Sequence, residues 1–203
     1  MPETEMDYLG TGFKIINFPT WVIRNSDGVE EPQITEEASA YVQERMNFLR
    51  FERGKFISGC TEIDNVLGEA ISAFFFREHR DEYKRGQFHD FIIDTTIFSF
   101  SQRKNVLQQI MKKYPREFPL LDSHIRQIMF EQIDYVIKMR NAFAHGKIII
   151  NYRERTNTLS YFNSSKNRIE ELPLNSELFS TLSTITDDLS SQIIENCIFG
   201  EVV

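Results

Sequence analysis

The sequence predicts a mainly α protein, a helical bundle of about five helices with a small β-hairpin after the fourth. Apolar residues recur every three or four positions through most of residues 35–145 and again near the C-terminus, which is the spacing of one buried helix face. Two short β-rich runs follow Gly146 and predict the hairpin. The 203 residues are 41% hydrophobic and 26% charged, a composition typical of one globular domain. No run of about eighteen apolar residues predicts a membrane span.

Two parts are expected along the chain. Residues 1–34 are predicted to form an irregular or weakly extended arm, because glycine and proline interrupt them repeatedly. A β-prone run, Trp21-Val22-Ile23, lies inside this arm. Three roles stay open for the arm: a partner-binding segment, a strand against the hairpin, or disorder. Residues 35–203 are predicted to form a single helical domain.

The helices are predicted from apolar spacing and from residues that favour helix ends. Four helices are expected before the hairpin: over residues 35–53, over 55–78, from Ser99 to before Pro115, and from about Asp122 to Gly146. Ser99 and Gln102 have the spacing of a capping box. Residues 77–90 are polar and are predicted to form a loop. A hairpin over about 147–162 and a last helix over about 175–198 complete the domain.

The fourth predicted helix carries a charged residue at an inward position. Its apolar stripe runs through Ile133 and Val136, and Arg140 continues this stripe at helical spacing. A buried arginine is costly unless it has a partner or a chemical role. We therefore expect Arg140 to point inward for a purpose.

Charge is distributed unevenly. The net charge of −7 and the pI of about 5.2 argue against nucleic-acid binding by the chain as a whole. Residues 1–37 carry eight acidic residues against two basic ones, whereas residues 138–155 carry five basic residues against one acidic one. Lys138, Lys147 and Arg153 belong to this basic segment and are candidate RNA contacts. A solvated rim of the domain is the alternative interpretation.

Cysteine and histidine usage predicts neither a disulfide framework nor a metal site. Cys60 and Cys197 are too few for either, so a cytoplasmic location is expected and no cofactor is assigned. His79 and His89 lie in the predicted loop without cysteine or aspartate at ligand spacing, so we expect them to be surface residues.

The motif that carries chemistry is Arg140-Asn141-Ala142-Phe143-Ala144-His145-Gly146, at the end of the fourth predicted helix. This string resembles the defining motif of the HEPN superfamily: an arginine, a polar residue and a histidine close a late helix. The segments Cys60–Phe75 and Phe98–Leu107 are similar to segments of HEPN-like proteins such as the mannitol operon regulators. The resemblance covers about residues 40–150.

The resemblance implies a metal-independent endoribonuclease of bacterial toxin–antitoxin systems or phage defence. RNA supplies its own nucleophile, the 2′-OH, so the protein must move protons and stabilise the charge of the phosphorane. Histidine titrates near neutrality, which suits His145 for proton transfer. Arg140 would bind the phosphate and the transition state, because guanidinium matches phosphate oxygens. Asn141 would orient these groups.

The resemblance also implies partners. Family members commonly pair two motif copies about a two-fold axis, which predicts a homodimer with a composite active site, alongside an antitoxin or regulatory protein. In the toxin branch controlled by a nucleotidyltransferase, a tyrosine often stands three residues after the histidine. Ile148 occupies that position here, so control by adenylylation is not expected.

Two other interpretations remain open. The chain would then be a non-catalytic HEPN-like module that binds RNA, a nucleotide or a protein, or a purely structural dimeric subunit. In the structural case, Arg140 would bond helix C-terminal carbonyls or pair with an acidic residue (Glu62, Asp64 or Glu69). His145 would interact with the helix dipole, and Asn141 would cap the helix end.

Overall fold

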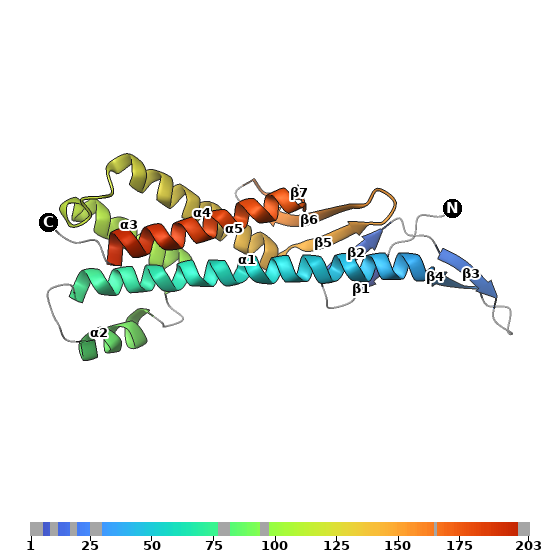
Figure 1. Ribbon diagram of the computed structural model, residues 1–203, viewed down its shortest axis with the longest axis horizontal. Coiled ribbons are helices and arrows are strands. Elements are labelled where there is room, and N and C mark those ends of the chain that lie inside the picture. The colour runs from blue at the N-terminus through green and yellow to red at the C-terminus, as the bar shows by residue number, and fades with distance from the viewer. Residues whose placement is uncertain are drawn as a thin grey trace. The chain divides into compact units, whose positions relative to one another are not determined.

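The computed structural model describes residues 6–8, 12–16, 20–24, 30–76, 82–93, 98–164 and 166–198. The protein is mainly α, as the sequence predicts (Figure 1). The α-helices of this part of the chain are α1 (Glu36–Phe76), α2 (Glu82–Phe88), α3 (Phe100–Lys113), α4 (Ser123–His145) and α5 (Ser176–Ile193). The strands are β1 (Met6–Tyr8), β2 (Phe13–Ile16), β3 (Thr20–Arg24), β4 (Glu30–Ile34), β5 (Lys147–Asn151), β6 (Thr156–Asn163) and β7 (Arg168–Pro173).

The chain divides into two compact units. Unit 1 comprises residues 1–55 and 141–179, and unit 2 comprises residues 56–140 and 180–203. Each unit therefore combines segments that are distant in sequence. These boundaries fall inside α1, α4 and α5, and none coincides with residue 35, where the sequence places the start of a helical domain.

The first two predicted helices are one. α1 continues without interruption (Figure 1). It comprises 41 residues, and Gly54 lies inside it. Nothing lies within 4 Å of the Cβ position of this exposed glycine. A glycine in a helix interior costs only about 1 kcal/mol relative to alanine, which the packing on both sides of Gly54 outweighs.

The prediction of a loop over residues 77–90 is wrong for residues 82–90. α2 and a π-helical turn, His89–Ile93, occupy this stretch, while His79 lies outside the described residues. Arg85 and His89 from these elements both approach Glu69 of α1, at 2.7 and 3.4 Å. Ile93 is buried and contacts α1 at Gly68, where an added Cβ would lie 2.7 Å from the Ile93 Cγ2 atom. This tertiary packing stabilises the helical turns of residues 82–93. Their polar sequence lacks the apolar spacing that predicts a helix.

Local signals place the starts of α3 and α4 correctly. The Ser99 N–H donates to Gln102 Oε1 at 2.7 Å, which is one half of the predicted capping box. Asp122 Oδ1 accepts hydrogen bonds from the N–H groups of His124 and Ile125, each at 2.8 Å. These bonds lower the pKa of Asp122, since they favour its charged form at the helix N-terminus.

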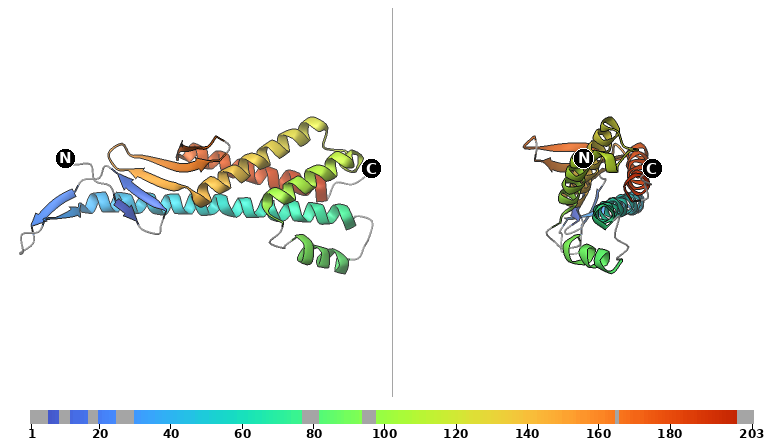
Figure 2. Two further views of the ribbon diagram at one scale, coloured as in Figure 1. Left: turned by 180° about the vertical axis from the view of Figure 1, so that it is seen from behind. Right: turned by 90° about the vertical axis from the view of Figure 1, so that its left-hand side faces the viewer.

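A five-stranded sheet in the order β1-β2-β5-β6-β7 belongs to unit 1 (Figure 2). The predicted hairpin corresponds to β5 and β6, but β6 also pairs with β7, a strand that the sequence analysis does not identify. β2 pairs in parallel with β5, with Phe13 opposite Ile148. Of the roles left open for residues 1–34, a strand against the hairpin is therefore the one observed for β2. β3, which contains Trp21-Val22-Ile23, forms a separate pair with β4.

Each unit has its own apolar core. In unit 1 the Phe179 ring packs against Phe48 of α1 and Phe143 of α4, with ring centroids 6.1 and 6.0 Å away, and Ile148 of the sheet is also buried. In unit 2, α5 packs so closely on α1 that a Cβ on Gly59 would lie 2.9 Å from Thr186 Oγ1. No helix among the described residues is long and apolar enough to cross a membrane.

Candidate functional site

The motif residues Arg140, Asn141 and His145 lie in the last two turns of α4, and all three are exposed. The expectation that Arg140 points inward is wrong. The buried face of α4 is formed by Met129, Phe130, Ile133, Val136, Met139, Ala142 and Phe143. Near the end of the helix, Met139 and Phe143 are buried. The long Arg140 side chain reaches solvent from the edge of this buried face.

Helix geometry separates the predicted trio. An α-helix advances about 100° per residue, so Arg140 and His145, five residues apart, point about 140° away from each other. Asn141 and His145 are four residues apart and share one stripe with Lys138, which is also exposed. The structure therefore brings Asn141 and His145 together with Lys138, and it places Arg140 on another side of the same helix.

Arg140 lies close enough to Cys60 of α1 for its positive charge to affect the pKa of the Cys60 thiol. Burial raises the pKa of the Cys60 thiol from 9.0 to about 12, and the positive charge of Arg140 opposes this rise. The acidic residues that the structural interpretation names for Arg140 also take part in other contacts. Asp64 pairs with Arg103 at 3.2 Å, Glu69 pairs with Arg85, and Glu62 accepts a hydrogen bond from Ser190.

α4 ends at His145, and the next residue, Gly146, is closely packed. Gly146 donates its N–H to the Ala142 carbonyl at 2.7 Å. A Cβ at Gly146 would lie 2.4 Å from that carbonyl oxygen, 2.8 Å from Leu159 Cδ1 and 3.0 Å from the Ser160 carbonyl oxygen. The predicted helix stop at Gly146 is confirmed, and β6 approaches this position so closely that a side chain would not fit without a shift. This approach fixes the joint between the His145 turn and β5.

A cation that the sequence analysis does not identify lies beside the last turn of α4. Arg53 of α1 donates from Nη2 to the Ala144 carbonyl at 3.4 Å, a long and weak hydrogen bond. Its guanidinium is thereby held next to the residue that precedes His145. Because 91 residues separate Arg53 from Ala144, no local sequence signal predicts this proximity.

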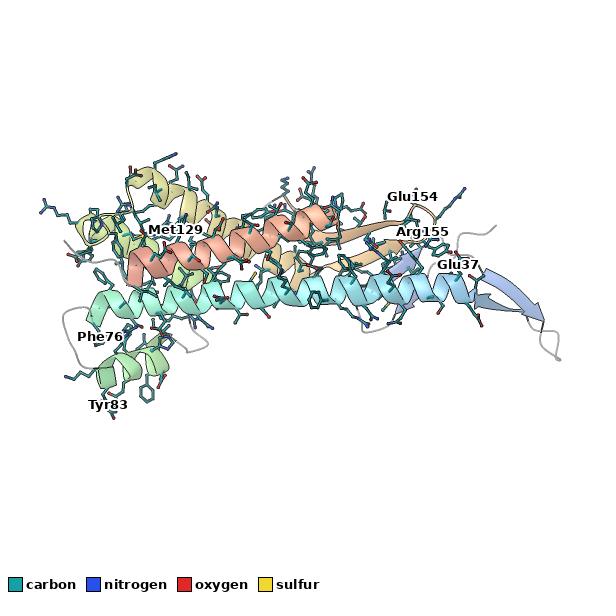
Figure 3. All side chains as sticks on the ribbon, viewed as in Figure 1. Glu37, Phe76, Tyr83, Met129, Glu154 and Arg155 are labelled. Atoms are coloured by element: carbon teal, nitrogen blue, oxygen red, sulfur yellow. The ribbon has the colours of Figure 1, made fainter. Side chains whose placement is uncertain are left out.

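The basic segment contributes further cations in unit 1. Lys147 is half-buried at the start of β5, and Arg153 is exposed in the turn before β6. In the same turn, which Figure 3 shows beside the labelled Glu154, the Arg155 guanidinium lies 4.0 Å from the ring centroid of Tyr41 and 4.2 Å from that of Tyr152. These cation–π contacts hold the turn against α1. Lys138 belongs to unit 2.

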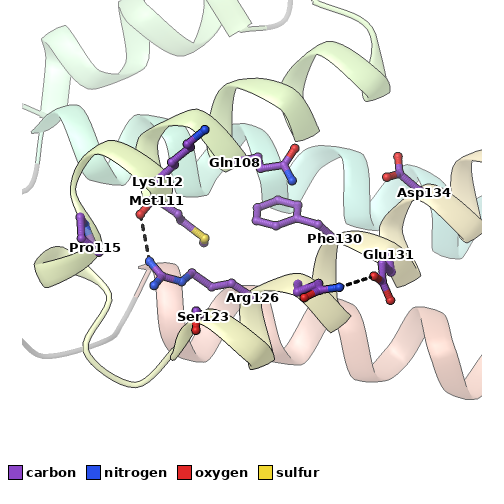
Figure 4. A pocket seen from close by; sticks show the side chains of 10 residues that line it. Gln108, Met111, Lys112, Pro115, Ser123, Arg126, Phe130, Glu131 and Asp134 are labelled. Atoms are coloured by element: carbon purple, nitrogen blue, oxygen red, sulfur yellow. Dashed lines mark hydrogen bonds between the residues drawn. The ribbon is translucent and has the colours of Figure 1, made fainter.

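A groove between α3 and α4 in unit 2, with a volume of about 520 Å³, has opposite charges on its lining (Figure 4). The lining includes Arg126, Phe130, Glu131 and Asp134. Arg126 Nη1 donates to the Met111 carbonyl at 2.9 Å, and Asp134 pairs with Lys104 at 3.0 Å. The charged side chains that line this groove are thus largely paired within the fold. The carboxylates of the groove also disfavour an anionic ligand.

The described residues contain no cluster of three or more histidine, cysteine, aspartate or glutamate side chains that could hold a metal ion. Comparison with family models, with curated proteins and with solved structures finds no match to this chain. The function therefore has to be argued from the site itself.

Proposed function

We propose that this protein is a metal-independent endoribonuclease of HEPN type, acting in the cytoplasm in a bacterial toxin–antitoxin system or in phage defence. The observation that carries the proposal is the exposure of Arg140, Asn141 and His145 together at the C-terminal end of one helix. All three side chains are accessible to a polynucleotide.

The reaction needs one proton removed and one delivered. A histidine takes the proton of the 2′-OH, whose oxygen attacks the adjacent phosphorus. The bond from phosphorus to the 5′ oxygen breaks, and a protonated histidine gives its proton to that leaving oxygen. The products are a 2′,3′-cyclic phosphate and a 5′-hydroxyl end. An arginine stabilises the charge that develops on the phosphoryl oxygens.

The angle between Arg140 and His145 favours a site built from two copies. The Arg140 and His145 side chains leave α4 in directions about 140° apart. The end of a single α4 helix is therefore poorly arranged to bring both side chains to one phosphate. In a homodimer, His145 of each copy would supply one proton-transfer group, and Arg140 would bind the phosphate from the partner. Lys138, Lys147 and Arg153 are the candidate RNA contacts around this site, and an antitoxin or regulatory protein would cover it.

The experiment is RNA cleavage in EDTA, with detection of cyclic phosphate ends. We expect Arg140→Ala and His145→Ala each to lower the rate by about 100-fold or more, and Asn141→Ala to lower it less. Matched controls come from the same unit and the same helix: Arg116→Ala, on an exposed arginine, and His124→Ala, on an exposed histidine in the first turn of α4. Absence of cleavage, or cleavage that is equal in the motif and control variants, would refute the proposal.

A non-catalytic HEPN-like module that binds RNA, a nucleotide or a protein is the second candidate. The net charge of −7 and the angular separation of Arg140 from His145 favour it. For this candidate we expect a bound ligand that stabilises the wild-type chain against heat. The Arg140→Ala variant would lose this stabilisation, and no cleavage would be seen in either protein.

A further inference from the structure

A second groove in unit 2 has the composition of a nucleotide site. It lies between the C-terminal end of α1 and the helix α3, and its volume is about 410 Å³, which is within the usual range for small-ligand pockets. We call it the aromatic groove and define it by six lining residues: Phe74, Phe75, Asn105, Gln109, Lys113 and Tyr114.

The apolar part of the aromatic groove includes two aromatic rings that are exposed at the surface. Phe75 is 52% exposed and Tyr114 is 42% exposed, although both are large aromatic side chains. Phe74 fixes both rings, with centroids 5.3 Å from Phe75 and 5.2 Å from Tyr114, and it stacks on the buried Phe118 at 6.1 Å. The exposed rings are therefore held on a packed base and are preorganised for stacking.

The polar part of the aromatic groove suits a base with an attached phosphate. Asn105, Gln109 and Lys113 follow one another at intervals of four residues, so they form one exposed edge of α3. The two amides can donate to and accept from the edge of a base. Lys113 Nζ lies over the Tyr114 ring, 5.3 Å from its centroid, which places a cation at this exposed ring.

Charge distinguishes the aromatic groove from the neighbouring groove in Figure 4. Lys113 is the one charged side chain among its described lining residues, whereas Glu131 and Asp134 line the other. An anionic ligand therefore meets the positive charge of Lys113 and no carboxylate among the described lining residues.

We propose that the aromatic groove binds a nucleotide unit, with the base stacked on Phe75 and Tyr114, the base edge against Asn105 and Gln109, and the phosphate at Lys113. The nucleotide is either free or part of a single-stranded RNA. Stacking on aromatic rings beside a cation is how proteins hold single strands without strict sequence preference. This inference does not require the α4 motif to be catalytic.

The test measures binding of fluorescein-labelled oligoadenylate of ten nucleotides by anisotropy in EDTA. The full chain is used in the Arg140→Ala/His145→Ala background, which removes cleavage and motif contacts. We expect Phe75→Ala and Tyr114→Ala each to weaken binding by about 5- to 100-fold. Lys113→Gln should reduce the slope of log affinity against log salt by about 1. Competition by AMP at comparable affinity identifies a free-nucleotide site, and failure of AMP to compete identifies a strand site.

Matched controls separate the groove from general surface effects. Phe51→Ala and Tyr83→Ala remove aromatic rings that are 68% and 74% exposed and lie outside the groove; Figure 3 shows Tyr83 pointing away from α2. If the ring variants misfold, Asn105→Asp and Gln109→Glu place a carboxylate on exposed groove positions and should abolish binding. The proposal is overturned if the oligonucleotide does not bind at low salt, or if groove and control variants bind it equally. It is also overturned if the ring variants change only the sedimenting mass, which would make the groove a self-association surface.

Discussion

The substitution Gly146→Ala tests whether the close packing of β6 against the end of α4 holds the candidate site in place. The added Cβ would lie 2.4 Å from the Ala142 carbonyl oxygen and 3.0 Å from the Ser160 carbonyl oxygen. Both neighbours are backbone atoms, and the Ala142 carbonyl already accepts the Gly146 N–H at 2.7 Å. Neither can rotate away as a side chain could, so the backbone at residue 146 must shift relative to the last turn of α4 and to β6. Overpacking of this kind costs about 1–3 kcal/mol.

Gly54→Ala is the matched control for this prediction. The same methyl group is added, but nothing lies within 4 Å of the Cβ position, and the residue is inside α1. We expect Gly54→Ala to stabilise the protein by about 0.5–1 kcal/mol, because alanine loses less backbone entropy in a helix. The two substitutions therefore have opposite expected signs.

The assay is urea and thermal unfolding of both variants, followed by far-ultraviolet circular dichroism. For a chain of this length, 1 kcal/mol shifts the midpoint of thermal unfolding by about 2–4 °C, so the two signs are separable. Gly146→Ala should also lower the cleavage rate, because the displaced turn carries Asn141 and His145. A Gly146→Ala protein as stable as wild type would show that the close approach of β6 does not constrain the helix end.

Three further outcomes follow from the structure. Cys60, whose pKa is raised to about 12, should resist iodoacetamide at pH 8 in the folded protein and react at once in urea; rapid alkylation of the native thiol would contradict its burial. Glu170 has a pKa lowered from 4.5 to about 2, mainly by its hydrogen bonds to Lys166 and Asn163. Its contribution to stability is therefore complete above pH 4.5 and lost as the pH falls towards 2, and Glu170→Gln should flatten this acid limb of the pH–stability curve. Arg155 has a φ of 56°, so Arg155→Gly should be more stable than Arg155→Ala by about 1 kcal/mol in paired urea titrations, and equal stabilities would argue against backbone strain at this turn.

The sequence alone determined the features that depend on neighbouring residues. Helix starts at Ser99 and Asp122 follow from side chains that satisfy N–H groups within three residues, and the end of α4 follows from Gly146. The hairpin follows from two β-prone runs separated by a polar turn. The Arg140-Asn141-x3-His145 motif was also visible, because its residues share one helix. Apolar periodicity was sufficient for the fold class, since it records which face each helix buries.

Only the tertiary structure decided which distant segments meet. The two helices predicted over residues 35–53 and 55–78 are one continuous helix, α1, and residues 82–93 form helical turns because they pack on α1. The parallel pairing of β2 with β5, the approach of Arg53 to Ala144 and the aromatic groove all join residues from separate parts of the sequence. Arg140 shows the physical reason most clearly. Periodicity assigned its Cα to the inner face, but the path of a long side chain to solvent depends on what surrounds the helix end.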